Sequence, residues 1–428
     1  MIFYYLLTTV TLSVIFWISN RLRLSGSSGE KRSAGANIAV VGVALAVMVM
    51  EITLAVVSGF KSEISNKIMG FDAQITVGLP YDYSTGMQSE LLTMTPDLMA
   101  VLEQATSQDS KISLGVQLPA MIKTDDDFSG VVFVGHDDAH DFTFEYGNII
   151  EGSYPDSNND AASSIAISRY VANQLKVGVG DKLYVYFFVK GTLKTRKSTI
   201  AGIYDSNLGE YDKMVAYAPI KFLQNVMGVD SISGTQLEYT GIPIDKIDEC
   251  AIDIQQKLGD ALQAGVLEEF YPVSTVLQSG AIYFNWLSLL DTNVIVIFVL
   301  MLCVALFTLV SSLYLIVLDR IPTIGLLKSL GASRKWLVRL FVSLGMRLAL
   351  IGIIIGNIIG CGVCLFQELT GLIKLNPEMY YLSEVPINIE WLPFVLLNVG
   401  VIVVAYLVLF IPARSAAKID PTESIRYE

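Results

Sequence analysis

Histidine is almost missing from this sequence, because only His136 and His140 occur among its 428 residues. No Ser–His–Asp set can be assembled, and this scarcity of imidazole groups disfavours a hydrolase. The chain also lacks a Gly-x4-Gly-Lys-Ser/Thr motif, so it has no P-loop to cradle nucleotide phosphates. Chemistry that depends on either feature has to come from another chain.

Cysteine is equally scarce. Cys250 is the only cysteine in residues 61–292, which excludes a disulfide within that segment. The others, Cys303, Cys361 and Cys364, lie in apolar runs. The CxxC spacing of Cys361 and Cys364 therefore indicates packing rather than redox chemistry or zinc binding.

Long apolar runs are what the sequence does have, in keeping with a mean hydropathy of +0.53 and 53% apolar residues. A helix needs about 20 apolar residues to cross the bilayer core. Four runs are long enough: residues 36–60, 293–318, 348–366 and 391–411. We therefore expect a multi-pass α-helical membrane protein with four transmembrane helices.

Charge divides along the same boundaries. Residues 61–292 hold 15 Lys and Arg against 31 Asp and Glu, whereas the rest of the chain is net positive. Basic residues flank the runs on one side, so the positive-inside rule places both termini in the cytoplasm and the acidic segment outside. An acidic surface also argues against nucleic acid as a partner.

The predicted organisation, in chain order, is an N-terminal cytoplasmic or interfacial segment (1–35), transmembrane helix 1 (36–60), a periplasmic domain (61–292), helix 2 (293–318), a cytoplasmic coupling region (319–347), helix 3 (348–366), a periplasmic loop (367–390), helix 4 (391–411) and a cytoplasmic tail (412–428). Residues 1–18 are apolar but lack the basic start and cleavage site of a signal peptide. They either lie in the membrane interface, which we favour, or form a further span.

The large outer segment alternates between strand-like and helix-like patterns, which predicts an α+β domain. Residues 181–191 and 196–205 have the composition of strands, and residues 168–181 and 243–262 have helical spacing. A change in turn density near Asn158 suggests two lobes. "GHDDAH" (135–140) has two histidines at a metal-binding interval, but the flanking acids and the lack of an evident third ligand favour a solvated loop.

Glu51 is an ionisable residue inside the first apolar run. Charge within a membrane span is unfavourable and usually faces a cavity or a partner. The alternative is a position near the outer interface, from which the carboxylate reaches water. The small residues Gly42, Ala44 and Ala46 would allow another helix to approach closely.

The segment "VLDRIPTIGLLKSLGASRKWLVRLF" (317–341) predicts a short cytoplasmic helix between two membrane helices. Pro322 steers the chain out of the preceding helix, Gly331 suits a left-handed C-terminal position, and Ser333 suits the N-cap of the next helix. Ile324, Leu327 and Leu330 would form an apolar stripe beside Leu326. Two turns bind a membrane surface weakly, so docking of a partner protein is the preferred interpretation.

Several stretches together resemble FtsX-like ABC-transporter permeases of the lipoprotein-releasing LolC/LolE type. They are "LVSSLYLIVLDRIPTIGLLKSLGAS", the closing "IPARSAAKIDPTESIRYE", and "GANIAVVGVALAVMVMEITLAVVSGF" with the run that follows it. The phrases "AISRYVANQLKVGVGDKLYV" and "AGIYDSNLGEYDKMVAYAP" are similar to that family's periplasmic domain. The likeness covers about residues 14–428.

This resemblance implies a non-enzymatic permease subunit in the inner membrane of a Gram-negative bacterium. It would bind no cofactor itself and would work with a separate ABC ATPase that uses ATP and magnesium, and with a second permease, identical or paralogous. The substrate would be a lipoprotein, extracted for transfer to the outer membrane. The alternative is a mechanotransmitting permease for export or envelope signalling; a receptor or cell-division regulator, or an enzyme, is a more distant alternative.

The resemblance also carries site residues. The ATPase-coupling residues would be Ile324, Leu326, Leu327, Lys328, Ser329 and Leu330, and the substrate-cavity residues Met48, Glu51, Ile52, Ala55, Phe298, Leu302 and Leu306. The family's carrier-binding hook is represented here only by the shorter segment 189–198, which puts recruitment of a soluble lipoprotein carrier in doubt. Its basic residues could still contact a periplasmic partner; they are Lys190, Lys194, Arg196 and Lys197.

Overall fold

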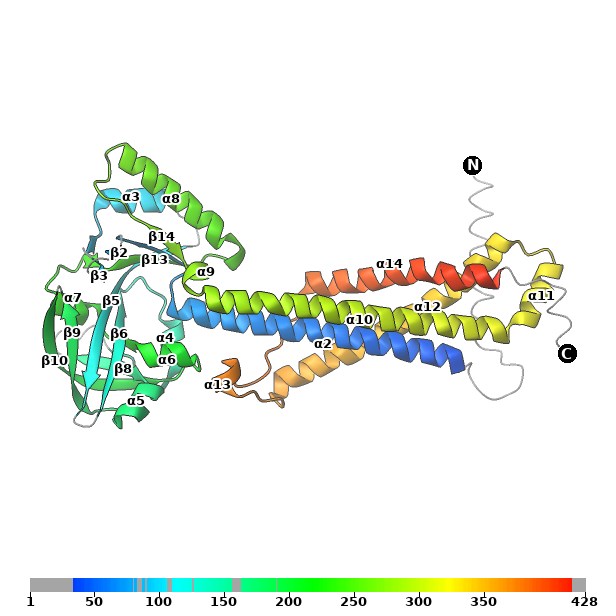
Figure 1. Cartoon of the computed structure of the whole chain (residues 1–428), viewed down its shortest axis with the longest axis horizontal. Coiled ribbons are helices and arrows are strands. Elements are labelled where there is room, and N and C mark those ends of the chain that lie inside the picture. The colour runs from blue at the N-terminus through cyan, green and yellow to red at the C-terminus, as the bar shows by residue number, and fades with distance from the viewer. Residues whose placement is uncertain are drawn as a thin grey trace. The chain divides into compact units, whose positions relative to one another are not determined.

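The computed structural model describes residues 34–79, 81–82, 87–88, 91–105, 110–124, 127–155, 163–189 and 191–417 (Figure 1). These residues form two compact units. The first comprises the described residues up to Ser62, Leu287–Lys374 and those from Glu384 onward; the second comprises Glu63–Trp286 and Leu375–Ser383. The predicted N-terminal segment 1–18 and most of the closing motif lie outside the described residues.

Among the described residues, four long helices have the length and composition to cross a membrane. They are α2 (Ala34–Phe71), α10 (Ala281–Asp319), α12 (Arg334–Thr370) and α14 (Trp391–Ala416). Their most apolar windows have mean hydropathies between 2.5 and 3.1. The four predicted helices are confirmed, and α2, α10 and α12 continue beyond the apolar runs through flanking polar residues.

The core of the helical unit is a single apolar cluster to which all four helices contribute. Representative buried members are Val47 of α2, Leu309 of α10, Phe341 of α12 and Leu409 of α14. Because water is absent from the bilayer core, such contacts depend on close packing rather than on hydrophobic burial. Two short helices also belong to the loops of the chain, α11 (Ile321–Ser329) and α13 (Pro377–Tyr380).

The second unit is rich in β-structure. Its strands are β1 (Ile75–Gly78), β2 (Tyr81–Asp82), β3 (Met87–Gln88), β4 (Leu92–Thr93), β5 (Lys111–Lys123), β6 (Phe128–His136), β7 (Ile149–Gly152), β8 (Ser164–Ser168), β9 (Lys182–Val189), β10 (Thr192–Tyr204), β11 (Val215–Tyr217), β12 (Ser233–Gly234), β13 (Gln236–Thr240) and β14 (Val273–Thr275). Its helices are α3 (Pro96–Gln104), α4 (Thr143–Asn148), α5 (Arg169–Leu175), α6 (Gly209–Met214), α7 (Ile220–Met227), η1 (Ile244–Lys246), α8 (Ile247–Gln263) and α9 (Val276–Ser279).

The main sheet runs β14-β1-β13-β5-β6-β11-β8-β10-β7, and β9 pairs with both β10 and β5. Strands β5, β6, β11, β8, β10 and β9 therefore pair in a closed ring. Closure pairs these six strands with one another, while the sheet as a whole still ends at β14 and β7. Phe133 and Phe187, both fully buried, pack within this domain with ring centroids 5.3 Å apart and an angle of 52° between the ring planes.

The expected α+β character is confirmed, but the division into two lobes near Asn158 is wrong. Strands from both sides of that position share one sheet, since β5 pairs with β9 through Ala120↔Phe187 and its neighbours. The predicted strands correspond to β9 and to the second half of β10. The predicted helices correspond to α5, whose N-cap Ser168 accepts a hydrogen bond from Val171 N, and to η1 with α8.

Candidate functional site

The predicted short helix between the second and third long helices is α11, and its ends are defined as the sequence indicates. Gly331 adopts a left-handed φ of 92° directly after the helix. Ser333 Oγ then accepts a hydrogen bond of 3.3 Å from Trp336 N at the start of α12. Both local predictions are confirmed. A short turn capped by Ser333 therefore joins α11 to α12, whereas among the described residues Arg320 makes no side-chain capping hydrogen bond at the start of α11.

The predicted coupling residues do not share one face of α11. Ile324 is 1% exposed and belongs to the apolar core of the helical unit, and Leu327 packs partly buried against it. Leu326 and Leu330, in contrast, are 61% and 76% exposed. Lys328 is half-buried, and the exposed Ser329 hydroxyl donates to Leu326 O at 2.8 Å. The surface that a partner could reach therefore centres on Leu326 and Leu330.

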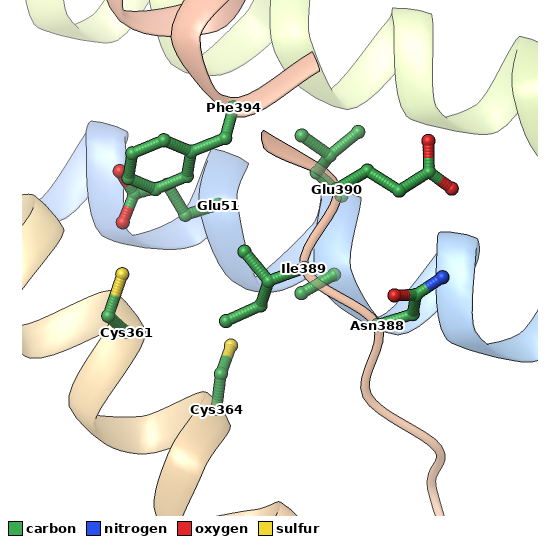
Figure 2. A pocket seen from close by; sticks show the side chains of 9 residues that line it. Glu51, Cys361, Cys364, Asn388, Ile389, Glu390 and Phe394 are labelled. Carbon is green, nitrogen blue, oxygen red and sulfur yellow. The ribbon is translucent and has the colours of Figure 1, made fainter. Parts of the chain in front are cut away.

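Glu51 lies in a small pocket of the helical unit (Figure 2). Its side chain comes from α2, Cys361 and Cys364 come from α12, and Phe394 comes from α14; the stretch 388–390 closes the remaining side. The cavity has a volume of about 10 Å³, room for about one water molecule. It is too small to hold an acyl chain in this arrangement of the subunit.

The Glu51 side chain is only 4% exposed. Within the described residues neither carboxylate oxygen meets hydrogen-bond geometry, although the Asn398 amide lies close enough to interact. The alternative of a carboxylate that reaches water at the interface is therefore wrong. A buried carboxylate with few partners is a polar point inside an otherwise apolar bundle.

The other predicted cavity residues are distributed over two helices. Ala55 lines the same pocket as Glu51, whereas Met48 and Ile52 are half-buried on α2. On α10, Phe298, Leu302 and Leu306 pack partly buried against the apolar core. Of the predicted set, Glu51 and Ala55 are the members that the structure brings together around a pocket.

A feature that the sequence analysis missed is a row of glycines on α12 that faces α2. A Cβ atom at Gly352 would lie 2.8 Å from Val43 Cβ, and one at Gly356 would lie 2.9 Å from Val47 Cβ. Gly360, one helical turn further on, faces Glu51. The signal was available as glycine at every fourth position in "IGIIIGNIIGCG", a pattern that permits close approach of membrane helices.

The basic residues proposed as a partner contact have different environments. Lys190 lies outside the described residues. Lys194 donates to Val226 O at 2.8 Å, at the C-terminal end of α7. Arg196 and Lys197 are exposed on β10, with Lys197 Nζ 6.0 Å from the centre of the Tyr184 ring. Lys194 therefore has a structural role, and Arg196 and Lys197 are the members open to a partner.

The prediction that "GHDDAH" forms a solvated loop is wrong for both histidines. His136 is the last residue of β6 and is buried, and the ring of His140 stacks on it with 3.8 Å between centroids. A single-sequence pattern search missed the surrounding carboxylates because one of them is far away in the chain.

Two family models match the chain. The FtsX-like permease C-terminal model matches residues 295–421, and the MacB-like periplasmic core domain model matches residues 37–245. The periplasmic region of MacB from Actinobacillus actinomycetemcomitans aligns with 51% of this chain and 96% of that chain, at a TM-score of 0.33 and 10% identity. That score is too low to support an argument about function.

Curated relatives are similar over most of the chain. The lipoprotein-releasing system transmembrane protein LolC of Xylella fastidiosa is 26% identical and aligns over 91% of this chain and 93% of its own length. LolE of Haemophilus influenzae is 22% identical over 95% of this chain and 98% of its own length. LolC of Neisseria meningitidis is 22% identical over 91% of this chain and 94% of its own length. Taken with the four long helices and the α+β domain between the first two, these matches show that the chain is similar to FtsX-like permeases over residues 295–421 and to MacB-like periplasmic core domains over residues 37–245.

Proposed function

We propose that this chain is the permease subunit of an inner-membrane ABC complex that releases lipoproteins for transfer to the outer membrane. The observation that carries the proposal is the end-to-end similarity to LolC and LolE proteins, which covers both the membrane helices and the periplasmic domain. On this proposal the host is a Gram-negative bacterium. The chain binds no cofactor, and a separate ATPase subunit uses ATP and magnesium.

The geometry of α11 supports a coupling role. Leu326 and Leu330 offer exposed apolar contacts on the cytoplasmic side, whereas Ile324 anchors the helix in the core. A groove in the ATPase that accepts these two leucines would be connected directly to α10 and α12. Because α10 is one continuous helix from Ala281 to Asp319, a push on α11 would be transmitted along its length.

The outer surface of α10 supports contact with lipid-like groups or with a second permease. Between residues 295 and 307 its exposed side chains are all apolar: Ile295, Val296, Val299, Leu300, Cys303, Val304 and Phe307. These residues are the ones open to acyl chains in the present arrangement. Phe298, Leu302 and Leu306 would reach a shared cavity only if α10 turned about its axis, which is a motion that coupling to α11 could supply.

The partners on this proposal are the ATPase, a second permease that is either identical or paralogous, and the lipoprotein substrate. Arg196 and Lys197 are the exposed basic side chains through which a periplasmic lipoprotein carrier could be contacted. Carrier binding is the least supported of these contacts, because the segment between β9 and β10 is short.

Reconstitution tests the proposal. Proteoliposomes that contain an acylated lipoprotein, the ATPase, and the permeases with or without this chain are incubated with ATP and a soluble acceptor. We expect release into the soluble fraction only when this chain and a hydrolysis-competent ATPase are both present. Equal release without this chain would contradict the proposal. ATP hydrolysis that depends on the chain but releases no lipoprotein would instead favour a mechanotransmitting permease.

A further inference from the structure

The chain's two histidines lie together inside the periplasmic domain. His136 ends β6, and His140 follows in a turn in which His140 N donates to Asp137 O at 3.2 Å. The two imidazole rings are stacked, with centroids 3.8 Å apart and an angle of 7° between their planes. Corresponding nitrogens of the two rings therefore point the same way. The side chains are 5% and 10% exposed.

Two buried glutamates lie at opposite edges of this pair of rings. Glu145, from the first turn of α4, places Oε1 2.9 Å from His140 Nε2 and 4.0 Å from His136 Nε2. Glu238, from β13, places Oε2 2.9 Å from His136 Nδ1 and 3.9 Å from His140 Nδ1. The glutamate side chains are 1% and 2% exposed. Each carboxylate thus faces the same edge of both imidazoles.

The cluster can form because Gly115 of β5 has no side chain. Strand β5 lies between β6 and β13, and Gly115 pairs with His136 on one side and with Gln236 on the other. A Cβ atom at position 115 would lie 2.2 Å from Glu238 Oε1. Because glycine has no side chain, the Glu238 side chain can pass over β5 at this position and reach the histidines. Gln236 Nε2 donates to Glu238 Oε1 at 2.8 Å and fixes the carboxylate there.

The cluster leaves polar atoms unsatisfied. Within the part of the chain that the structure describes, Nδ1 of both histidines and Oε2 of both glutamates are buried without hydrogen-bond geometry. His136 Nδ1 and Glu238 Oε2 are close, but they do not meet that geometry. Phe142 packs edge-on against both rings, so water has little access from that side. Two buried carboxylates in such a setting require a positive charge.

We propose that His136, His140 and Glu145 bind a divalent transition-metal ion of the zinc class, with Glu238 holding the two imidazoles from behind. One ligand atom from each of His136, His140 and Glu145 already lies within 4.8 Å of the others. Because the two ring planes are parallel, the Nε2 lone pairs run side by side, so at least one imidazole turns out of the stack when zinc, at about 2.0–2.2 Å from each ligand atom, binds both nitrogens.

The placement of Glu238 matches the usual support of a metal-bound histidine. If the metal takes the Nε2 atoms, both Nδ1 atoms carry the proton on the side of Glu238, and a small turn of the carboxylate lets His136 Nδ1, 2.9 Å away, donate to it, which fixes the tautomer and strengthens that imidazole as a ligand. The charges also balance, because one dication offsets two carboxylates. The burial of the cluster indicates a structural ion that fastens the 137–142 turn and α4 to the sheet. This inference does not depend on lipoprotein release.

The test uses the full chain in nanodiscs, purified without a histidine tag, stripped with a chelator and then loaded with Zn²⁺ or Co²⁺. We expect one Zn²⁺ to be retained per chain after desalting, and the Co²⁺ form to show the intense visible bands of a four-coordinate site, in which Glu145 Oε2, unpartnered within the described residues, is the fourth donor atom. Retention of no Zn²⁺ by the wild-type chain would overturn the proposal, and so would a purely octahedral, aqueous-type Co²⁺ spectrum. These wild-type measurements need no variant to fold.

Variants then assign the ligands. We expect His140→Gln and Glu145→Gln to abolish stoichiometric retention, and Glu238→Gln to weaken binding by about 10–100-fold. Asp138→Asn, which removes an exposed carboxylate from the same turn, is the matched control and should bind as the wild type does. Zn²⁺ should also raise the Tm of the wild type and of the control, but not that of His140→Gln. Equal binding by His140→Gln and the wild type would overturn the assignment.

Discussion

A Cβ atom at position 360 would lie 2.5 Å from Glu51 Oε2, so Gly360 of α12 leaves the space in which the buried Glu51 carboxylate of α2 sits. The same face of α12 carries Gly352 and Gly356 against Val43 and Val47. The contact between the two helices therefore depends on the absence of side chains at three successive turns.

Gly360→Ala should destabilise the helical unit. The added methyl group overlaps the far end of the buried Glu51 side chain, which has to turn away, at about 1 kcal/mol. We expect a lower Tm in nanodiscs and faster proteolysis of the loop between α12 and α14. Gly362→Ala, two residues away on the same helix, meets no atom within 4 Å and should leave the Tm unchanged. Equal Tm values for the two variants would contradict the packing argument.

Leu326→Asp on α11 should weaken binding of the ATPase by about tenfold or more, because it places a charge in the proposed apolar contact. The side chain is exposed, so the fold should be unaffected.

Ile324→Ala should act differently. Truncation of this core residue should lower stability by about 2–4 kcal/mol. Binding measured with purified ATPase, alongside thermal unfolding, separates the two effects, and an ATPase affinity unchanged by Leu326→Asp would count against the contact.

Asp212 should make the stability of the periplasmic domain depend on pH. Burial raises the pKa of this carboxyl group from 3.8 to about 6, while Ser206 Oγ donates to Oδ1 at 2.7 Å. The folded domain therefore binds this proton more tightly than the unfolded chain does, and its contribution to stability is lost as pH rises from about 4 through 6. The loss amounts to about 2 kcal/mol after allowance for partial solvent screening.

Asp212→Asn keeps the oxygen that accepts the Ser206 hydrogen bond and removes the titration. We expect the unfolding midpoint of the variant to fall less between pH 5 and pH 8 than that of the wild type. Other titrating groups contribute equally to both proteins, so the difference between the two curves isolates Asp212. If the midpoints of the two proteins changed with pH in parallel, burial would not raise the pKa of Asp212.

Lys194 and Arg196 should respond differently to substitution, although they lie two residues apart. Lys194 donates to Val226 O at the end of α7, where a cation is favoured by the helix dipole. Lys194→Ala should therefore lower stability by about 1 kcal/mol. Arg196→Ala, on an exposed side chain, should leave stability unchanged. Denaturant unfolding of the two variants distinguishes them. Equal denaturant midpoints for the two variants would show that Lys194 does not stabilise the fold.

The membrane helices and the capped turn between α11 and α12 could be predicted from sequence, because their determinants are local. An apolar run must be long enough to cross a bilayer, and Gly331 and Ser333 act on their immediate neighbours. Which side of α11 packs against the helical core could not be predicted in the same way. Whether Ile324 or Leu326 turns inward depends on where α10 and α12 lie, and a two-turn helix carries too little pattern to decide.

The cluster of His136, His140, Glu145 and Glu238 could not be predicted from sequence, because it depends on contacts between residues far apart in the chain. Glu238 is brought to His136 only through the registers of β13 with β5 and of β5 with β6, and the local sequence contains no sign of either pairing. The acidic residues near the histidines instead suggested a solvated turn. The single closed ring of strands was missed for the same reason, since it depends on the pairing of β5 with β9.

We propose that α11 passes the action of a separate ATPase to the membrane helices during lipoprotein release. The most direct measurement is ATP-driven release from proteoliposomes that contain the Leu326→Asp, Leu330→Asp double variant, compared with the wild type at equal amounts of folded permease. The account predicts that release falls to the level seen without ATP. Release at the wild-type rate would contradict it.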